Sequence, residues 1–208
     1  MPTAQQSSQL GKRPLRADSE RTVRTILEAA ERVFAANPAA TMEQVAQAAG
    51  VARTTVHRRF ATREALLEEL TGWAARQFAE AVASAHADST PPLVALYQVT
   101  ANVLRVKTDW WFAMSRTGDR AHPEAARVHA EVRDDCERLL RRAREAGVLR
   151  PDADLGWTRR VYYALIHEAA AEAAAEGVAE GGDAEALATR VVDALLRGFG
   201  SPTAPVIA

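Results

Sequence analysis

Residues 41–60 read TMEQVAQAAGVARTTVHRRF, and this stretch decides the fold of the first part of the chain. Thr41 can accept a hydrogen bond from a free backbone N–H of the turn that follows it, and Gln44, three residues later, can return one to the backbone of Thr41. This capping-box pattern predicts the start of a short helix. Gly50 can adopt the left-handed backbone conformation that ends a helix in a sharp reversal, so a second short helix is expected soon after it.

The apolar residues of this stretch are spaced so that the two short helices pack around one small core. They are Val45, Ala46, Val51, Val56 and Phe60. The pattern is that of a helix-turn-helix, in which the second helix lies in the major groove of DNA. Its outward face would carry side chains suited to base edges and phosphates, namely Arg53, Thr54, Thr55, His57, Arg58 and Arg59. A helical hairpin that serves packing alone is the alternative.

Helix is predicted for the rest of the chain as well, because Ala, Leu, Glu and Arg dominate and the alternating pattern of strands is nearly absent. Apolar residues recur at helical spacing from Ser19 to the stop at Asn37-Pro38, and Thr62 can cap a long helix that runs past Phe78. The other expected helices cover about residues 42–49, 53–60, 91–107, 110–116, 123–146, 155–176 and 184–199. The predicted fold class is therefore all-α.

Residues 41–67 resemble the DNA-binding domain of the TetR family of bacterial transcriptional regulators, and the similarity extends over about residues 20–72. The resemblance implies that the helix after Gly50 is the recognition helix and that Arg63, at the start of the next helix, contacts phosphate. The candidate DNA contacts are then Thr41, Arg53, Thr54, Thr55, His57, Arg58, Arg59 and Arg63. The chain departs from the family pattern at His57 and Arg59, where Tyr and His are more common. The extra arginine would strengthen the electrostatic attraction to DNA.

Charge is divided unevenly along the chain. Residues 1–65 hold 10 basic and 6 acidic side chains, whereas the remainder holds 16 and 21, although the whole chain has a net charge of only -1. A basic head on an acidic body suggests that the head binds a polyanion and that the body has another task.

Composition, spacing and the family resemblance together predict four parts. We expect a flexible basic tail over residues 1–18 and a three-helix DNA-binding domain, with the helix-turn-helix, over residues 19–66. A larger helical domain for effector binding and dimerisation follows over residues 67–200, and a flexible tail over residues 201–208 ends the chain.

Two helices near the C-terminus, over residues 155–176 and 184–199, carry apolar or small stripes that need a partner. Pairing with the same two helices of a second chain would form a four-helix interface and would present two recognition helices to a palindromic operator. The candidate interface residues are Leu165, Ala169, Leu187, Val191 and Leu195. Burial inside one chain is the alternative, and the family resemblance favours the homodimer.

Aromatic residues are scarce, at 6% of the chain, yet they gather in the body. Together with neighbouring polar tips they could line an apolar cavity for a small molecule. The candidate ligand-binding residues are Trp73, Phe78, Tyr97, Trp110, Trp111, Met114, Trp157, Tyr163 and His167. Aromatic side chains at helical spacing also occur in ordinary cores, and the resemblance, which implies a ligand pocket in this domain, favours the cavity.

Several classes of protein are excluded by what the sequence lacks. Cys136 is the single cysteine, and His122 and His129 have no further His or Cys to complete a metal set, so neither a disulfide nor a metal site is expected. No catalytic or cofactor-binding motif is present, so we expect neither enzyme activity nor a cofactor. A polar N-terminus and the absence of a long apolar run favour a cytoplasmic protein without a membrane span.

The sequence therefore predicts a homodimeric transcriptional regulator that binds double-stranded DNA at a palindromic operator. It is expected to act as a repressor that a small, largely apolar effector releases. The alternative is a DNA-binding regulator without an effector, controlled by a protein partner or acting as an activator.

Overall fold

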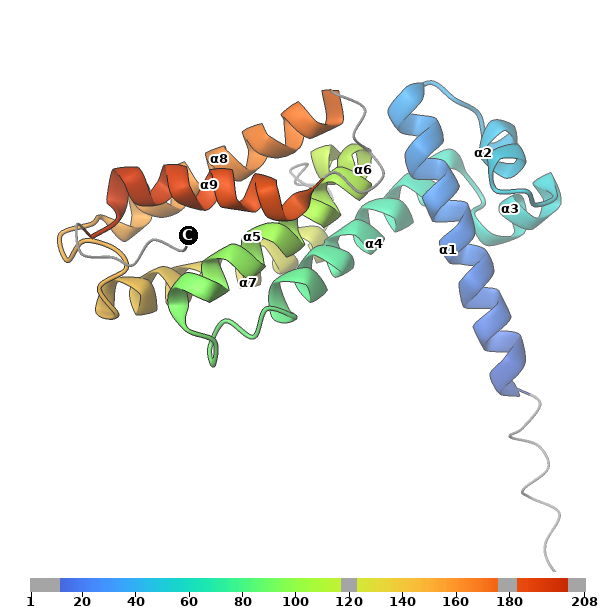
Figure 1. Cartoon of the computed structure of the whole chain (residues 1–208). Helices are drawn as coiled ribbons and strands as arrows, with labels where there is room; N and C mark the ends of the chain where they lie inside the picture. The colour runs from blue at the N-terminus through green and yellow to red at the C-terminus, as the bar shows by residue number, and fades with distance from the viewer. Residues whose placement is uncertain (1–11, 117–122, 176–182, 202–208) are drawn as a thin grey trace, which may run out of the picture. The chain divides into compact units, whose positions relative to one another are not determined.

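A computed structural model describes residues 12–116, 123–175 and 183–201, and within these ranges every regular element is a helix (Figure 1). The all-α fold predicted from the sequence is confirmed. The chain divides into two compact units, and the division falls between Leu70 and Thr71. The sequence placed it between residues 66 and 67, but the division lies inside a continuous helix, where no turn residue marks it.

The first unit contains α1 (Lys12–Ala36), α2 (Met42–Ala48), α3 (Arg53–Arg59) and the first turns of α4 (Arg63–Ala83). α1 packs against α2, and α2 packs against α3. The core is formed by side chains without exposed surface, among them Ile26, Leu27, Phe34, Val45, Val56 and Leu66. Val56 is the buried residue of α3, so the rest of this short helix faces outwards or only partly inwards.

α1 is longer than the sequence predicted. It begins at Lys12, so residues 12–18 belong to a helix and not to a flexible tail, while residues 1–11 lie outside the described part of the chain. Pro14 lies in the first turn of this helix. A proline in the first turn is compatible with a helix, because the first backbone N–H groups have no partner within the helix.

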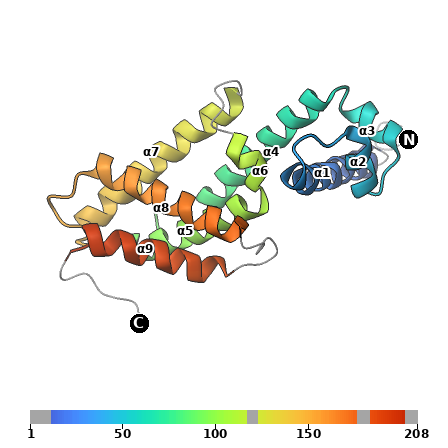
Figure 2. The ribbon, with the colours of Figure 1, turned by 90° about the horizontal axis from the view of Figure 1, so that it is seen from above.

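The second unit contains the rest of α4 and the helices α5 (Pro92–Asp109), α6 (Trp111–Arg116), α7 (Pro123–Glu145), α8 (Leu155–Ala175) and α9 (Ala184–Phe199). α5 packs against α6, α7, α8 and α9, and α8 packs against both α7 and α9. Figure 2 shows α5, α8 and α9 running side by side, with α7 crossing beside them. α5 is therefore the helix around which this unit is built.

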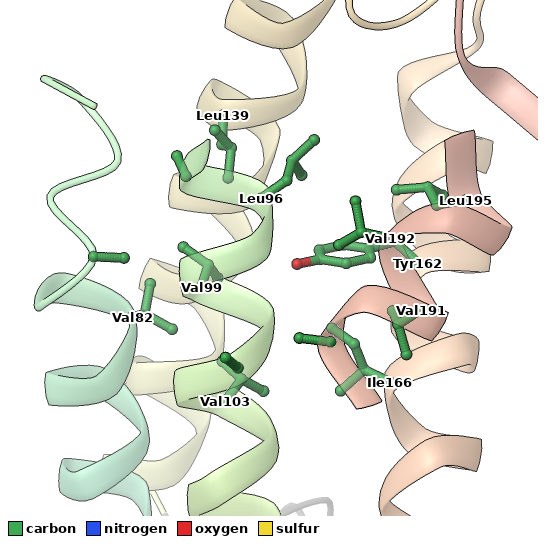
Figure 3. Close-up of a cluster of buried hydrophobic side chains, with 14 of the residues drawn as sticks. Val82, Leu96, Val99, Val103, Leu139, Tyr162, Ile166, Val191, Val192 and Leu195 are labelled. Carbon is green, nitrogen blue, oxygen red and sulfur yellow. The ribbon is translucent and has the colours of Figure 1, made fainter. Parts of the chain in front are cut away.

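A buried hydrogen bond joins α5 to α8. Tyr162 lies among the valines and leucines of the core, and its hydroxyl points towards α5 (Figure 3). Its Oη lies 2.7 Å from Oγ1 of Thr100, and Thr100 Oγ1 lies 2.6 Å from the carbonyl oxygen of Leu96, to which it donates. A threonine hydroxyl has one hydrogen, so Tyr162 is the donor to Thr100.

The residues predicted for the dimer interface lie mostly inside the subunit. Val191 and Leu195 of α9 lie in the core of this unit, with 4% and 0% of their surface exposed, and Ala169 of α8 is also buried. Leu165 and Leu187 are partly buried against the same core. An apolar stripe shows that one face of a helix is buried, but it does not identify the element that covers it. Here α9 packs against α5 and α8 of its own chain.

The end of the described chain is held by backbone hydrogen bonds. Arg150 N–H donates to the carbonyl of Phe199 at 2.9 Å, and Ser201 N–H donates to the carbonyl of Val148 at 3.0 Å. Ser201 is therefore part of the fold, whereas the tail was predicted to begin there; residues 202–208 lie outside the described part.

Because Tyr162 donates to Thr100, replacing Thr100 should destabilise the protein more than replacing Tyr162. Thr100→Val removes the acceptor and leaves the Tyr162 hydroxyl buried and unpaired, so the free energy of unfolding should fall by about 1–3 kcal/mol. Tyr162→Phe removes the hydroxyl while Thr100 keeps its bond to Leu96, so the loss should be about 0.5–1.5 kcal/mol. Urea denaturation at one protein concentration measures both. A larger loss for Tyr162→Phe would show that the assigned direction is wrong.

Candidate nucleic-acid interface and ligand cavity

The geometry of the turn between α2 and α3 follows the predicted pattern. Gln44 N–H donates to Oγ1 of Thr41 at 3.3 Å, and Thr41 N–H donates to Oε1 of Gln44 at 2.8 Å, which completes the capping box. Gly50 has a φ of 65°, and Val51 N–H donates to the carbonyl of Ala46 at 3.1 Å. The Thr41 side chain, a candidate DNA contact, therefore helps to start α2.

The outward face of α3 is basic and open. Arg53, Thr54, His57, Arg58 and Arg59 are exposed, and the remaining candidate on this helix, Thr55, is partly exposed. Within the described residues no hydrogen bond or ion pair holds Arg58 or Arg59. Arginine side chains in this state can reach phosphates or guanine edges without first breaking a bond inside the protein.

Arg53 has partners on both short helices. Its guanidinium lies 3.8 Å from a carboxylate oxygen of Glu43 in α2, and its Nε lies 3.4 Å from Nε2 of His57, one turn further along α3. All three side chains are exposed, so these interactions are weak and leave Arg53 able to rearrange.

Arg63, a candidate phosphate contact, directs its side chain at backbone carbonyls of its own unit. Its Nε donates to the carbonyl of Ala40 at 3.4 Å, and one of its Nη atoms donates to the carbonyl of Pro38. The guanidinium also lies 4.9 Å from the centre of the Phe34 ring. Arg63 thus ties the start of α4 to the connection between α1 and α2. The phosphate contact that the family resemblance implies for Arg63 stays a prediction.

A cavity of about 580 Å³ lies within the second unit, with walls from α4, α5, α6, α7 and α8. Its volume is in the range of small-molecule sites. Among the predicted ligand-binding residues, the structure brings together Phe78, Trp111, Met114, Tyr163 and His167 on its walls. The rings of Trp111 and His167 stack with their centres 5.9 Å apart.

The other predicted ligand-binding residues are not on the cavity wall. Trp157 is 51% exposed, beside the guanidinium of Arg160. Tyr97 donates its hydroxyl hydrogen to Asp193 of α9 at 2.8 Å, and burial, together with this carboxylate, raises the pKa of Tyr97 to about 12. Trp73 and Trp110 are partly buried elsewhere. The clustering of aromatic residues along the sequence did not show which face of each helix they occupy.

The cavity also has polar residues that were not among the predicted ligand-binding residues. Lys107 and Asp135 line it, as do His129 and Cys136. Burial lowers the pKa of Lys107, and burial together with the charge of Lys107 lowers the pKa of His129. Burial raises the pKa of the Cys136 thiol to about 12, so this cysteine is protonated at neutral pH.

A sequence signal for the polar wall existed in the helical spacing. Val99, Val103 and Lys107 follow one another at intervals of four residues, so they share one face of α5, and all three line the cavity. His129, Val132 and Cys136, which are spaced three and four residues apart, likewise share one face of α7 and line the cavity.

Two kinds of site are absent from the described part of the chain. No group of three His, Cys, Asp or Glu side chains there is placed to hold a metal ion, and His122, considered above as a possible ligand, lies outside the described residues. No described helix combines the length and the apolar character that a membrane span requires.

Comparison with known proteins gives a consistent result. The sequence model of the family described as bacterial regulatory proteins, tetR family, matches residues 26–70. The chain is 35% identical, over 156 residues, to the HTH-type transcriptional repressor LfrR of Mycolicibacterium smegmatis; the match covers 74% of this chain and 81% of that protein.

Solved structures show the same likeness over nearly the whole fold. The structure of the TetR-like regulator LfrR in complex with proflavine has a TM-score of 0.67 at 29% identity, covering 90% of this chain and 98% of that one. The TetR family regulator PfmR of Thermus thermophilus has a TM-score of 0.69 at 22% identity, covering 83% and 97%, and supports the fold alone.

The contacts of Arg63 predict a local effect on stability. Arg63→Met keeps an unbranched apolar stem but removes the hydrogen bonds to Ala40 and Pro38, so the first unit should lose about 1–3 kcal/mol of stability. The matched variant Arg59→Met, at an exposed position of α3, should change stability by less than about 0.5 kcal/mol. Hydrogen exchange of the α1 and α2 amides reports on this unit separately. Equal protection of these amides from exchange in the two variants would mean that the Arg63 hydrogen bonds do not stabilise the first unit.

Proposed function

The chain belongs to the tetR family of bacterial regulatory proteins, and from this premise we propose that it is a repressor that binds a palindromic operator as a homodimer and leaves it when a small, largely apolar effector enters the cavity. The observation that carries the proposal is the combination of an open basic α3 in one unit with a cavity of about 580 Å³ in the other.

The DNA-binding part rests on the exposed basic end of α3. His57, Arg58 and Arg59 form its last turn, and Arg58 and Arg59 have no partner among the described residues. Side chains of this kind supply both phosphate contacts and base readout in helix-turn-helix proteins. Arg63 contributes indirectly, by holding the connection that precedes α2.

The effector part rests on the cavity and on α4. α4 is shared by the two units, with residues up to Leu70 in the first and residues from Thr71 in the second. Phe78 and Val82 of this helix form part of the cavity wall. A ligand that displaces this wall therefore acts on the same helix that begins in the DNA-binding unit, which offers a route for release.

In the proposed homodimer α8 and α9 still form the contact, but through other faces than the apolar stripes predicted from the sequence. Because Val191 and Leu195 are buried in the subunit, the contact would use outward or partly buried residues, including Leu165, Leu187 and Ala194. A two-fold dimer suits a palindrome, because each subunit presents one recognition helix to one half-site.

The exposed arginines predict a defined change in salt dependence. Replacing both Arg58 and Arg59 by alanine should weaken binding to an operator selected from genomic fragments, and the slope of log affinity against log salt should become shallower by about 0.9 for each phosphate that is no longer neutralised. Arg141→Ala, at an exposed position of α7, is the matched control and should change neither quantity. Fluorescence anisotropy measures both, and an unaltered slope in the double variant would remove α3 from the DNA contact surface.

Blocking the cavity should uncouple the effector from DNA release. Ala126→Trp places a large ring at an exposed position on the cavity wall, so operator binding should persist while the neutral aromatic probe anthracene-9-methanol no longer weakens it. In the unmodified protein the probe should weaken operator binding about fivefold or more. Ala146→Trp, exposed just after α7 and away from the wall, should respond like the unmodified protein.

If a probe that fills the cavity leaves the operator affinity of the unmodified protein unchanged, the effector part of the proposal is wrong. A regulator controlled in another way would then be favoured.

A further inference from the structure

Lys107 is an unusual side chain for an apolar cavity. It is one of two lysines in the chain, and it lies on the cavity-facing stripe of α5 one turn beyond Val103. It is only partly exposed, and burial lowers its pKa. A buried ammonium group is costly unless an anion or several hydrogen-bond acceptors accompany it.

The described residues supply neither an anion nor hydrogen-bond acceptors for the Lys107 ammonium group. None of them forms an ion pair or a hydrogen bond with Lys107. Its neighbour on the wall, His129 of α7, adds a second basic group, and its ring lies 5.9 Å from the ring of Phe78, centre to centre. Lys107 thus faces another potential cation and not a carboxylate.

Asp135 is the acidic residue on the described cavity wall, and it has a basic partner on its own helix. Its carboxylate forms an ion pair with Arg138, one turn further along α7. The polar part of the cavity therefore presents an unpaired ammonium group and two imidazoles, His129 and His167, to whatever enters. This favours a negatively charged group in the ligand.

We propose that the effector is an amphipathic anion: a flat apolar body lies against Trp111 and Phe78, and a carboxylate or similar acidic group pairs with Lys107. The proposal rests on the proposed function and names the chemical class that the cavity selects. The acidic group supplies the partner that Lys107 lacks in the described chain, and His129 can donate a second hydrogen bond to it.

This class differs from the ligand in the solved complex of the relative LfrR. Proflavine, seen in that complex, is a cationic dye under neutral conditions. In the present cavity a cation would meet Lys107 without a free acidic group on the described wall to offset the repulsion. The two proteins would thus share a fold and differ in ligand charge.

Three flat probes of similar size and different charge test the proposal: anthracene-9-carboxylate, the neutral anthracene-9-methanol, and the cation proflavine. Isothermal titration calorimetry of the full-length protein should show the carboxylate binding about tenfold or more tightly than the alcohol, as expected for one hydrogen bond between charged groups. Proflavine should bind more weakly than the carboxylate.

Two variants assign the preference to the side chain. Lys107→Met, which keeps the apolar stem, should remove the tenfold preference by weakening only the carboxylate. Lys107→Arg should preserve it because the charge remains. Thermal unfolding of Lys107→Met should occur at the same or a higher temperature than that of the unmodified protein, since a buried unpaired charge is removed, so misfolding would not explain a lost preference.

The contrary outcomes separate the two proposals. If the carboxylate and the alcohol bind equally, if proflavine binds most tightly, or if Lys107→Met keeps the preference, the amphipathic anion is wrong while the effector cavity stands. If none of the three probes binds, the effector cavity itself is wrong, and the anion with it.

Discussion

The second unit depends on α5, one side of which packs in the core while another side lines the cavity. Thr100 and its neighbours on one side bond and pack against α8 and α9, while Val99, Val103 and Lys107 line the cavity. Tyr162 of α8 contacts both sides, because it lines the cavity while its hydroxyl donates to Thr100. A core hydrogen bond thus fixes the position of a wall residue, so that the cavity is held open by the packing around it.

The basic residues of the first unit form two groups with different surroundings. Arg63 directs its guanidinium at the carbonyls of Pro38 and Ala40 and so positions the segment before α2. Arg58 and Arg59 remain exposed on α3, where their charge is available to DNA. The division has a physical cause, since a guanidinium that already satisfies two backbone acceptors gives them up only at a cost. Removing an inward arginine and removing an outward one should therefore have different consequences.

Local signals made much of the fold predictable. Thr41 and Gly50 mark the ends of α2 through capping and a left-handed turn, and both act as the sequence indicated. Interactions between distant segments were harder to foresee. Val191 lies on the stripe expected to meet a second chain but packs inside its own, because amphipathicity does not name the partner. Lys107 was overlooked for a similar reason: the sequence does not show that a charge near the end of an apolar helix is enclosed by neighbouring helices.

The central claim is that DNA binding by α3 and ligand binding in the cavity are energetically coupled. The most direct measurement is the affinity of the free protein and of its operator complex for the same probe, using whichever of anthracene-9-carboxylate, anthracene-9-methanol and proflavine binds the free protein most tightly. Linkage requires that the operator weaken probe binding by the same factor by which the probe weakens operator binding, and we expect about fivefold or more. Equal probe affinity with and without operator DNA would contradict the account.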